Sequence, residues 1–159
     1  MKLALVPGSF DPITVGHLNI IERASAMFER VYVTAFINDA KLSRFDFEAR
    51  LEMMRAACSH LDNVICDTDS GMLTDYCRDK GISVVVKGVR NSQDLEYEMQ
   101  MAHFNRERYP QLDTVLLCAD PGNEGISSTA LYDLINSGGD YEKYVPENAL
   151  PIIKRLAGH

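Results

Sequence analysis

The sequence predicts an α/β fold: one domain, residues 1–159, with a doubly wound, five-stranded parallel sheet and additional C-terminal helices. Short β-forming runs alternate with stretches of helical periodicity, which is the pattern of parallel strands joined by right-handed crossovers. Three of the runs are almost entirely apolar in their centres, as strands covered on both faces are. The unusual polar residues gather in loops that follow strands, where open α/β sheets bind their ligands.

The expected strands are residues 2–6, 31–37, 64–67, 83–87 and 114–118, and the helices between them are residues 17–28, 47–60, 73–80 and 93–109. Several helix ends carry a recognisable signal. Asp46 can cap the second helix, Gly81 follows the third, and Pro110 follows the fourth. Strand and helix therefore alternate without a linker or a repeat.

Two further helices are expected near the C-terminus. The first covers residues 127–137 and is stopped by Gly138 and Gly139. The second follows Pro146, which suits a helix start, and we expect Pro151 to kink or shorten it.

Composition and charge exclude several classes of protein. The chain has 159 residues, 46% of them hydrophobic and 25% charged, which is ordinary for a globular domain. No apolar run is long enough to span a membrane and no signal-peptide pattern opens the chain, so we expect a cytoplasmic protein without membrane contact. The net charge of −7 argues against a nucleic-acid partner. Nucleotides stay possible, because a small site needs only a few focused cations.

The cysteines and carboxylates predict neither disulfides nor a bound metal. None of the four cysteines forms a Cys-x-x-Cys pair, and zinc is not expected. Cys66 and Cys118 lie in strand-like runs and are expected to be buried free thiols. The carboxylates do not cluster at metal-ligand spacing.

The loop over residues 7–17, Pro-Gly-Ser-Phe-Asp-Pro-Ile-Thr-Val-Gly-His, is the most informative segment. It follows the first strand and places His17 where a helical pattern begins. Free N–H groups and a partial positive charge make such a helix start suitable for phosphate. His17 could donate a hydrogen bond to phosphoryl oxygens as charge builds up on them. The alternative is that His17 only caps the helix and the glycines only make a turn.

Three more loops at the same edge of the sheet carry cations, glycines or hydroxyls. Lys87-Gly88-Val89-Arg90 ends the fourth strand, where a lysine and a forked arginine favour an anion site over simple solvation. Ser127-Ser128-Thr129 begins a helix and could cradle phosphates or merely cap it. Lys41, with Arg44 nearby, is either a ligand or solvated. On the helix from residue 93, Glu98 could accept hydrogen bonds from a ribose or base, while Met99 and Met101 are expected in the core.

Together these motifs carry a resemblance to a known family. Thr14-x-Gly16-His17 resembles the signature of the nucleotidyltransferase superfamily, whose fold is Rossmann-like. With Lys87-Gly88-x-Arg90, the run Asp94-Leu95-Glu96-Tyr97-Glu98-Met99-Gln100-Met101-Ala102, and Ile126-Ser127-Ser128-Thr129, nearly the whole chain resembles the bacterial phosphopantetheine adenylyltransferases.

The resemblance implies transfer of the adenylyl group of ATP to 4′-phosphopantetheine by direct in-line attack, giving 3′-dephospho-coenzyme A and pyrophosphate. It implies Mg²⁺, carried mainly by the ATP phosphates, and a homo-oligomer, commonly a hexamer. His17 would stabilise the transition state, and Ser9 would touch both substrates. Lys41 and Lys87 would hold the acceptor's phosphate, and Leu73 its pantetheine arm. The remaining ATP-binding residues by resemblance are Phe10, Gly88, Val89, Arg90, Glu98, Asn123, Glu124, Gly125, Ile126, Ser127, Ser128 and Thr129.

Some positions depart from the family pattern and keep alternatives open. Lys87 stands where the family usually has Arg, and Gly71 where it often has an acid. Gly125 and Thr129 make their loop similar to that of cytidylyltransferases such as the glycerol-3-phosphate enzyme, which is the alternative within this fold. A non-catalytic nucleotide-binding regulator would keep the cations but would not need His17.

Overall fold

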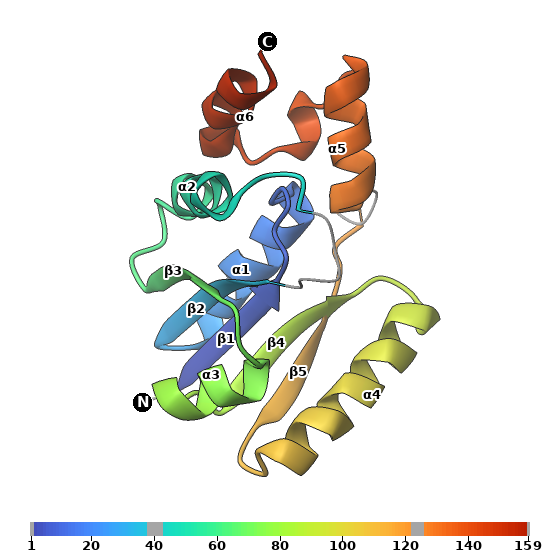
Figure 1. Cartoon of the computed structure of the whole chain (residues 1–159). Coiled ribbons are helices and arrows are strands. Elements are labelled where there is room, and N and C mark those ends of the chain that lie inside the picture. Colours follow the sequence, from blue (N-terminus) through green and yellow to red (C-terminus); the bar gives the residue numbers. More distant parts are fainter. Residues whose placement is uncertain (1, 38–42, 122–125, 159) are drawn as a thin grey trace.

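The computed structural model describes residues 2–37, 43–121 and 126–158. At its centre is a five-stranded sheet of order β3-β2-β1-β4-β5 in which every neighbouring pair is parallel (Figure 1). The strands are β1 (Leu3–Gly8), β2 (Arg30–Phe36), β3 (Val64–Asp69), β4 (Val84–Val89) and β5 (Asp113–Cys118). The predicted α/β class with a doubly wound parallel sheet is confirmed, and β3 and β4 each run two residues beyond their expected ends.

Helices connect the strands and form the C-terminal part of the chain. They are α1 (Val15–Met27), α2 (Phe47–Ala57), α3 (Leu73–Lys80), α4 (Ser92–Arg108), α5 (Ser128–Ser137) and α6 (Leu150–Ala157), with short 3₁₀ helices η1 (Glu142–Tyr144) and η2 (Glu147–Ala149). The expected capping signals are present. The Asp46 side chain accepts from the N–H of Ala49 at the start of α2, and Gly81 ends α3 with a left-handed φ of 72°.

The sheet separates two apolar layers. Ala4 and Val6 of β1 belong to the larger cluster, which α1, α2, α5 and α6 build on one face. Leu5 points to the other face and joins a smaller cluster with α3, to which Val85 of β4 contributes. Alternate residues of a strand point to opposite faces, so a strand buried on both sides has to be apolar throughout.

Two expectations for individual residues were wrong, and a third holds in part. Pro151 does not kink α6, because it lies in the first turn, where its missing N–H costs nothing; the α-helix is nevertheless short, since it begins at Leu150, after the 3₁₀ helix η2, rather than directly after Pro146. Cys118 is exposed rather than buried, because β5 ends there at the edge of the sheet. Met99 was expected in the core but is 49% exposed, because α4 turns it away from the sheet.

The strand order opens a crevice between β1 and β4. These strands pair at two positions, Ala4 with Val84 and Leu5 with Val85, whereas β1 and β2 pair along six. The carboxyl halves of β1 and β4 therefore lack the ladder that joins their other halves. The chain order also reverses between these two strands, and open α/β sheets bind ligands at such a point.

Candidate active site

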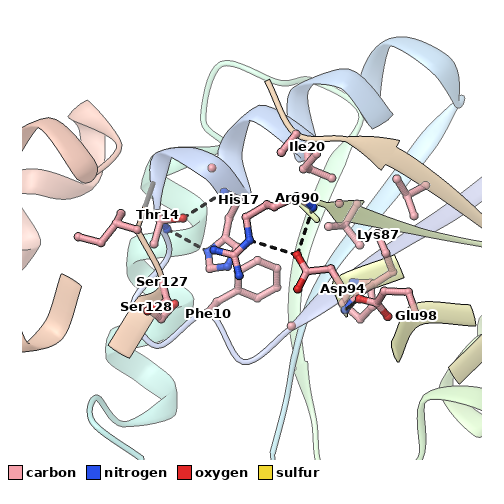
Figure 2. Close-up of a pocket in the computed structure, with 18 of the residues that line it drawn as sticks. Phe10, Thr14, His17, Ile20, Lys87, Arg90, Asp94, Glu98, Ser127 and Ser128 are labelled. Carbon is pink, nitrogen blue, oxygen red and sulfur yellow. Dashed lines mark hydrogen bonds and ion pairs between the residues drawn. The ribbon is translucent and has the colours of Figure 1, made fainter. Parts of the chain in front are cut away.

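A cavity of about 400 Å³ lies at the carboxyl ends of β1 and β4 (Figure 2). Its walls come from residues 6–8 of β1, the 7–17 loop, α1, the end of β4, the start of α4 and the start of α5. The sequence-predicted residues that line it are Phe10, His17, Lys87, Gly88, Arg90, Glu98, Ile126, Ser127 and Ser128. The fold therefore brings together motifs that lie more than a hundred residues apart.

His17 is held at the start of α1 by reciprocal bonds with Thr14. The Thr14 hydroxyl accepts from the backbone N–H of His17 at 3.1 Å, and the backbone N–H of Thr14 donates to His17 Nδ1 at 3.0 Å. This is a capping box with histidine in the place usually taken by Glu or Gln. Because a backbone N–H can only donate, Nδ1 must be the unprotonated nitrogen, and the proton of the neutral ring lies on Nε2.

The surroundings keep His17 neutral. Burial, and then the positive charges of Lys87 and Arg90, lower the pKa of His17 from 6.5 to about 4. At neutral pH the ring is thus a fixed Nε2–H donor in the cavity wall. It is poorly suited to act as a base, because its other nitrogen already accepts a hydrogen bond and its affinity for a proton is low.

Two close contacts fix the surroundings of His17. The buried Phe10 ring stands edge-on to the imidazole, with centroids 5.1 Å apart. One turn along α1 from His17, the Ile20 side chain lies 3.0 Å from where a Cβ at Gly88 would be. Glycine therefore lets α1 lie close to the end of β4.

The cations of the cavity are bonded to carboxylates of α4. Lys87 Nζ lies 3.1 Å from Glu98 Oε2, and Glu98 is only 8% exposed. Arg90 Nε lies 3.2 Å from Asp94 Oδ2, which also accepts from the Arg90 backbone N–H at 3.1 Å. Asp94 and Tyr97 also line the cavity; both belong to the run that carries the family resemblance, but neither was predicted as a site residue.

A second cavity of about 80 Å³ adjoins the first. Lys87, Glu98 and Tyr97 line both of them, while Leu73 and Met101 line the smaller one. Leu73, which the resemblance assigns to the pantetheine arm, is the first residue of α3. The two cavities adjoin and together extend from His17 to Leu73 at the start of α3; we call them the groove.

The remaining predicted site residues are not among the described residues that line the two cavities. Ser9 and Val89 adjoin lining residues but do not themselves line the cavity. Thr129, in the first turn of α5, accepts from Arg44 Nη2 at 2.5 Å. The other four lie outside the described residues: Lys41, Asn123, Glu124 and Gly125. The binding roles of all these residues stay predictions.

A polar network behind the 7–17 loop was missed entirely at the level of sequence. Asp11 and Arg50 are 5% and 3% exposed; Asp11 follows the cavity-lining Phe10 and accepts from the Phe45 N–H, and Arg50 donates to the carbonyl of Ser9, which precedes Phe10. One signal could have found Arg50. It precedes Met53, Met54 and Ala57 at helical spacing, so it occupies a core-facing position that normally needs an apolar side chain.

Within residues 2–37, 43–121 and 126–158, no group of three or more His, Cys, Asp or Glu side chains could hold a metal ion. In the same part of the chain, no helix has the length and apolar character that crossing a membrane requires.

Solved structures share this fold. A putative nicotinate-nucleotide adenylyltransferase from Vibrio parahaemolyticus matches with a TM-score of 0.73 at 16% identity, covering 99% of this chain and 94% of the other. A bifunctional NMN adenylyltransferase/ADP ribose pyrophosphatase from Francisella tularensis matches with a TM-score of 0.75 at 15% identity, covering 99% of this chain and 50% of the other. At such identities the likeness shows the fold alone.

Sequence comparison goes further. A cytidylyltransferase-like family model matches residues 5–133. The chain is 40% identical over 150 residues to the phosphopantetheine adenylyltransferase of Heliobacterium modesticaldum, covering 94% of this chain and 89% of that protein. It is 40% identical over 159 residues to the enzyme of the same name from Levilactobacillus brevis, covering 99% of each. The chain belongs to the cytidylyltransferase-like family and, within it, to the phosphopantetheine adenylyltransferases.

Proposed function

We propose that the chain transfers the adenylyl group of ATP to 4′-phosphopantetheine, producing 3′-dephospho-coenzyme A and pyrophosphate. The observation that carries this proposal is the neutral, fixed His17 in the wall of a cavity of about 400 Å³ that Lys87 and Arg90 also line. The names of its relatives, at 36–40% identity over nearly the full length, support the choice of both substrates.

In the proposed reaction an acceptor phosphate oxygen attacks the α-phosphorus of ATP in line with the departing pyrophosphate. The attacking oxygen is already an anion, so no base is required. Negative charge grows on the non-bridging oxygens, and the Nε2–H of His17 donates to one of them. Its direction is set in advance by the bond from Thr14 to Nδ1, so little reorganisation is needed.

The proposed division of the groove follows its two ends. Ser127 and Ser128 at the start of α5, with Gly88 and Arg90, would hold ATP, with the free N–H groups of the helix start facing its phosphates. Lys87 lines both cavities and would hold the acceptor's phosphate, with Leu73 beside the pantetheine arm. Glu98, bonded to Lys87, adjoins both substrates in this arrangement.

We propose that Mg²⁺ arrives on the phosphates of ATP. The carboxylates of the cavity do not form a ligand set for it, because Asp94 bonds Arg90 and Glu98 bonds Lys87. Bound Mg²⁺ would offset phosphate charge, and no role assigned above depends on a metal held by side chains.

We also propose that the chain forms a homo-oligomer, a hexamer by resemblance, in the cytoplasm. The surface of α4 supports association, since Leu95, Tyr97, Met99 and Phe104 are 42–58% exposed. The four free cysteines suit a reducing compartment.

Light scattering after size-exclusion chromatography would give the number of subunits. Replacement of Phe104 by Glu should yield a smaller species, and an unchanged mass would place the interface elsewhere.

The function is tested by pyrophosphate release with paired substrates: ATP or CTP, each with 4′-phosphopantetheine or glycerol 3-phosphate. We expect release only with 4′-phosphopantetheine, and a kcat/KM for ATP well above that for CTP. Rapid turnover of CTP with glycerol 3-phosphate would replace the proposed substrates while leaving the role of His17 intact.

A further inference from the structure

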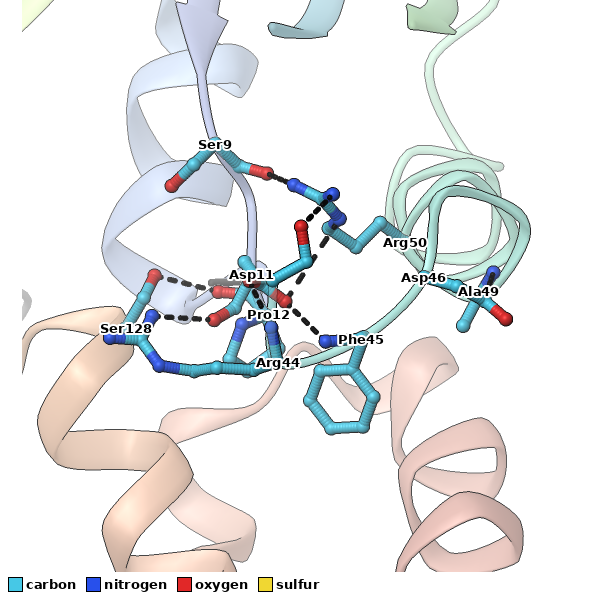
Figure 3. A network of polar contacts seen from close by, with 10 residues as sticks. Ser9, Asp11, Pro12, Arg44, Phe45, Asp46, Ala49, Arg50 and Ser128 are labelled. Atoms are coloured by element: carbon cyan, nitrogen blue, oxygen red, sulfur yellow. Dashed lines mark hydrogen bonds and ion pairs between the residues drawn. The ribbon is translucent and has the colours of Figure 1, made fainter. Parts of the chain in front are cut away.

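A buried carboxylate anchors the 7–17 loop from behind (Figure 3). Asp11 Oδ1 accepts from the backbone N–H of Phe45, and Oδ2 accepts from that of Arg44, both at 2.8 Å. Asp11 is 5% exposed and lies away from the cavity-lining set. It thus joins the loop after β1 to the segment that precedes α2.

Arg50 of α2 reaches the same loop. Its Nη1 donates to the backbone carbonyl of Ser9 at 3.0 Å, and its Nη2 donates to the Ser43 hydroxyl at 3.1 Å (Figure 3). Its Nε lies 4.0 Å from Asp11 Oδ1 and has no hydrogen-bond partner in the described structure. Burying a guanidinium that is 3% exposed and has one unsatisfied N–H costs desolvation free energy, which offsets what its contacts contribute to stability. Stability alone therefore gives a weak reason for this pair.

Phe10 lies between Ser9 and Asp11, and its backbone conformation indicates what the Arg50–Asp11 pair does. Phe10 has a φ of 46°, which is unusual for a bulky side chain, and strained backbone persists only where the surroundings over-determine it. Arg50 holds the carbonyl on one side, at Ser9, and Asp11 is held on the other. The conformation so enforced places the Phe10 ring against the His17 imidazole.

A further set of contacts fastens the loop to the start of α5. Arg44 Nη1 donates to the backbone carbonyl of Asp11 at 3.1 Å, while Nη2 donates to Thr129. The Ser128 hydroxyl donates to the carbonyl of Pro12 at 2.8 Å. The loop that carries His17 and the helix start proposed to hold ATP are therefore positioned by one network.

We propose that Arg50 and Asp11 are positioning residues for the transfer step. They hold the strained backbone at Phe10, and through the Phe10 ring they keep Nε2 of His17 aimed at the reacting phosphate. This inference rests on the proposed function for its activity readout, while its structural content, the setting of His17, can be measured without substrate.

The first test is Arg50→Met, which keeps the length of the side chain and removes the guanidinium. We expect kcat for pyrophosphate release to fall about 10–100-fold, because small misplacements of a catalytic group are costly. The KM for ATP should stay within about threefold, since the contacts that fasten the α5 start, made by Arg44 and Ser128, do not involve Arg50 and remain. The matched control is Arg155→Met, which removes an exposed arginine bonded to Glu52 of the same helix and should keep parental kcat.

The second test is an NMR titration of His17 in the substrate-free protein. The low pKa of His17 depends on burial and on Lys87 and Arg90. Because Arg50 is not among those causes, a rise of this pKa from about 4 towards 6.5 in Arg50→Met would report a displaced ring. If the parent protein released no pyrophosphate, the proposed function would fail, and this titration would still decide the inference.

Arg50→Lys covers the case in which Arg50→Met does not fold. Lysine keeps the buried charge but cannot contact the Ser9 carbonyl and the Ser43 hydroxyl as a fork. We expect a kcat between those of the parent and Arg50→Met, or at least threefold below the parent if Arg50→Met is unfolded. Parental kcat and parental His17 titration in a folded variant would overturn the inference. Equal losses in kcat and ATP affinity would also overturn it, because they indicate damage to the whole site.

Discussion

The two sides of the cavity are held in opposite ways. On the α1 side, the hydrogen bonds that His17 makes within the described residues go to its own helix cap, so its Nε2–H donor is fixed and available. On the β4–α4 side, Lys87 and Arg90 are each bonded to a carboxylate of α4. A group that is already in place can act on the transition state, whereas paired cations must exchange partners when phosphates enter. We therefore expect the α1 side to govern kcat and the β4–α4 side to govern substrate affinity.

The two sides of the cavity also differ in charge. The chain carries a net charge of −7, yet both proposed substrates are polyanions. When no substrate is bound, the α4 carboxylates pair with Lys87 and Arg90 and offset part of the positive potential of these two side chains. His17 adds no charge at neutral pH, so it contributes through direction rather than through attraction.

The largest effect is expected for His17→Ala. Loss of one preorganised donor should lower kcat by about 10²–10³ with little change in the KM for ATP. The matched control is His60→Ala, since His60 is an exposed histidine bonded to Glu22 away from the cavity. Steady-state pyrophosphate release measures both variants. A near-parental kcat in His17→Ala would remove the distinction between the two sides.

Arg90→Met should act on the other parameter. Removal of its guanidinium should raise the KM for ATP by about tenfold or more, as loss of a charge-assisted contact does, with a smaller effect on the KM of the acceptor. Arg78→Met is the control, since it removes an exposed arginine that is bonded to Asp75 and to the Arg108 carbonyl and does not line the cavity. If kcat fell instead and the KM for ATP did not change, the β4–α4 side would belong to the chemical step.

Lys87→Met should show the reverse preference. The KM for 4′-phosphopantetheine should rise by several-fold to tenfold, and the KM for ATP should change less, because Lys87 faces the groove towards Leu73. Lys154→Met removes an exposed lysine bonded to Glu142 and serves as the control. Equal changes for both substrates would mean that the groove is not divided as proposed.

Much of the fold could be predicted because its signals are local. Apolar strand centres, the Asp46 cap and Gly81 each depend on a few neighbouring residues, and the structure contains all of them. Local signals also placed His17 at a helix start. What they could not supply was its tautomer, which depends on the bond from Thr14 to Nδ1.

The unpredicted part of the site consists of pairs between side chains on different elements. The sequence assigned Lys87 and Glu98 to different substrates, whereas the structure bonds them to each other. Asp11 and Arg50 were not considered, because nothing in either local pattern indicates that the loop after β1 contacts α2. Such pairings depend on how the elements pack against one another, and periodicity in a single sequence does not determine that packing.

A smaller effect is expected for Thr14→Ala, which tests how the α1 side is fixed. The variant loses the hydroxyl that accepts from the His17 N–H, and removing such a cap costs about 1 kcal/mol of unfolding free energy. We expect kcat to fall less than tenfold, since the Thr14 backbone N–H can still donate to Nδ1. Asp46→Ala removes the cap of α2 and should cost similar stability without lowering kcat. Equal kcat in the two variants would show that the cap does not direct His17.

The smallest effect concerns pH, and it separates a neutral His17 from a charged one. Because its pKa is lowered to about 4 in the folded protein, the unfolded chain binds more protons than the native state between about pH 4 and 6.5. His17 should therefore make stability fall as pH falls through that window, and have no such effect above it. Urea unfolding of the parent and of His17→Gln at pH 7.5 and pH 5 measures the difference. We expect the parent to lose more stability on acidification than the variant, since glutamine does not titrate.

Equal losses, or a greater loss in His17→Gln, would mean that His17 is not held neutral. The α1 side would then attract phosphate by charge, as the β4–α4 side does, and the contrast between the two sides would disappear.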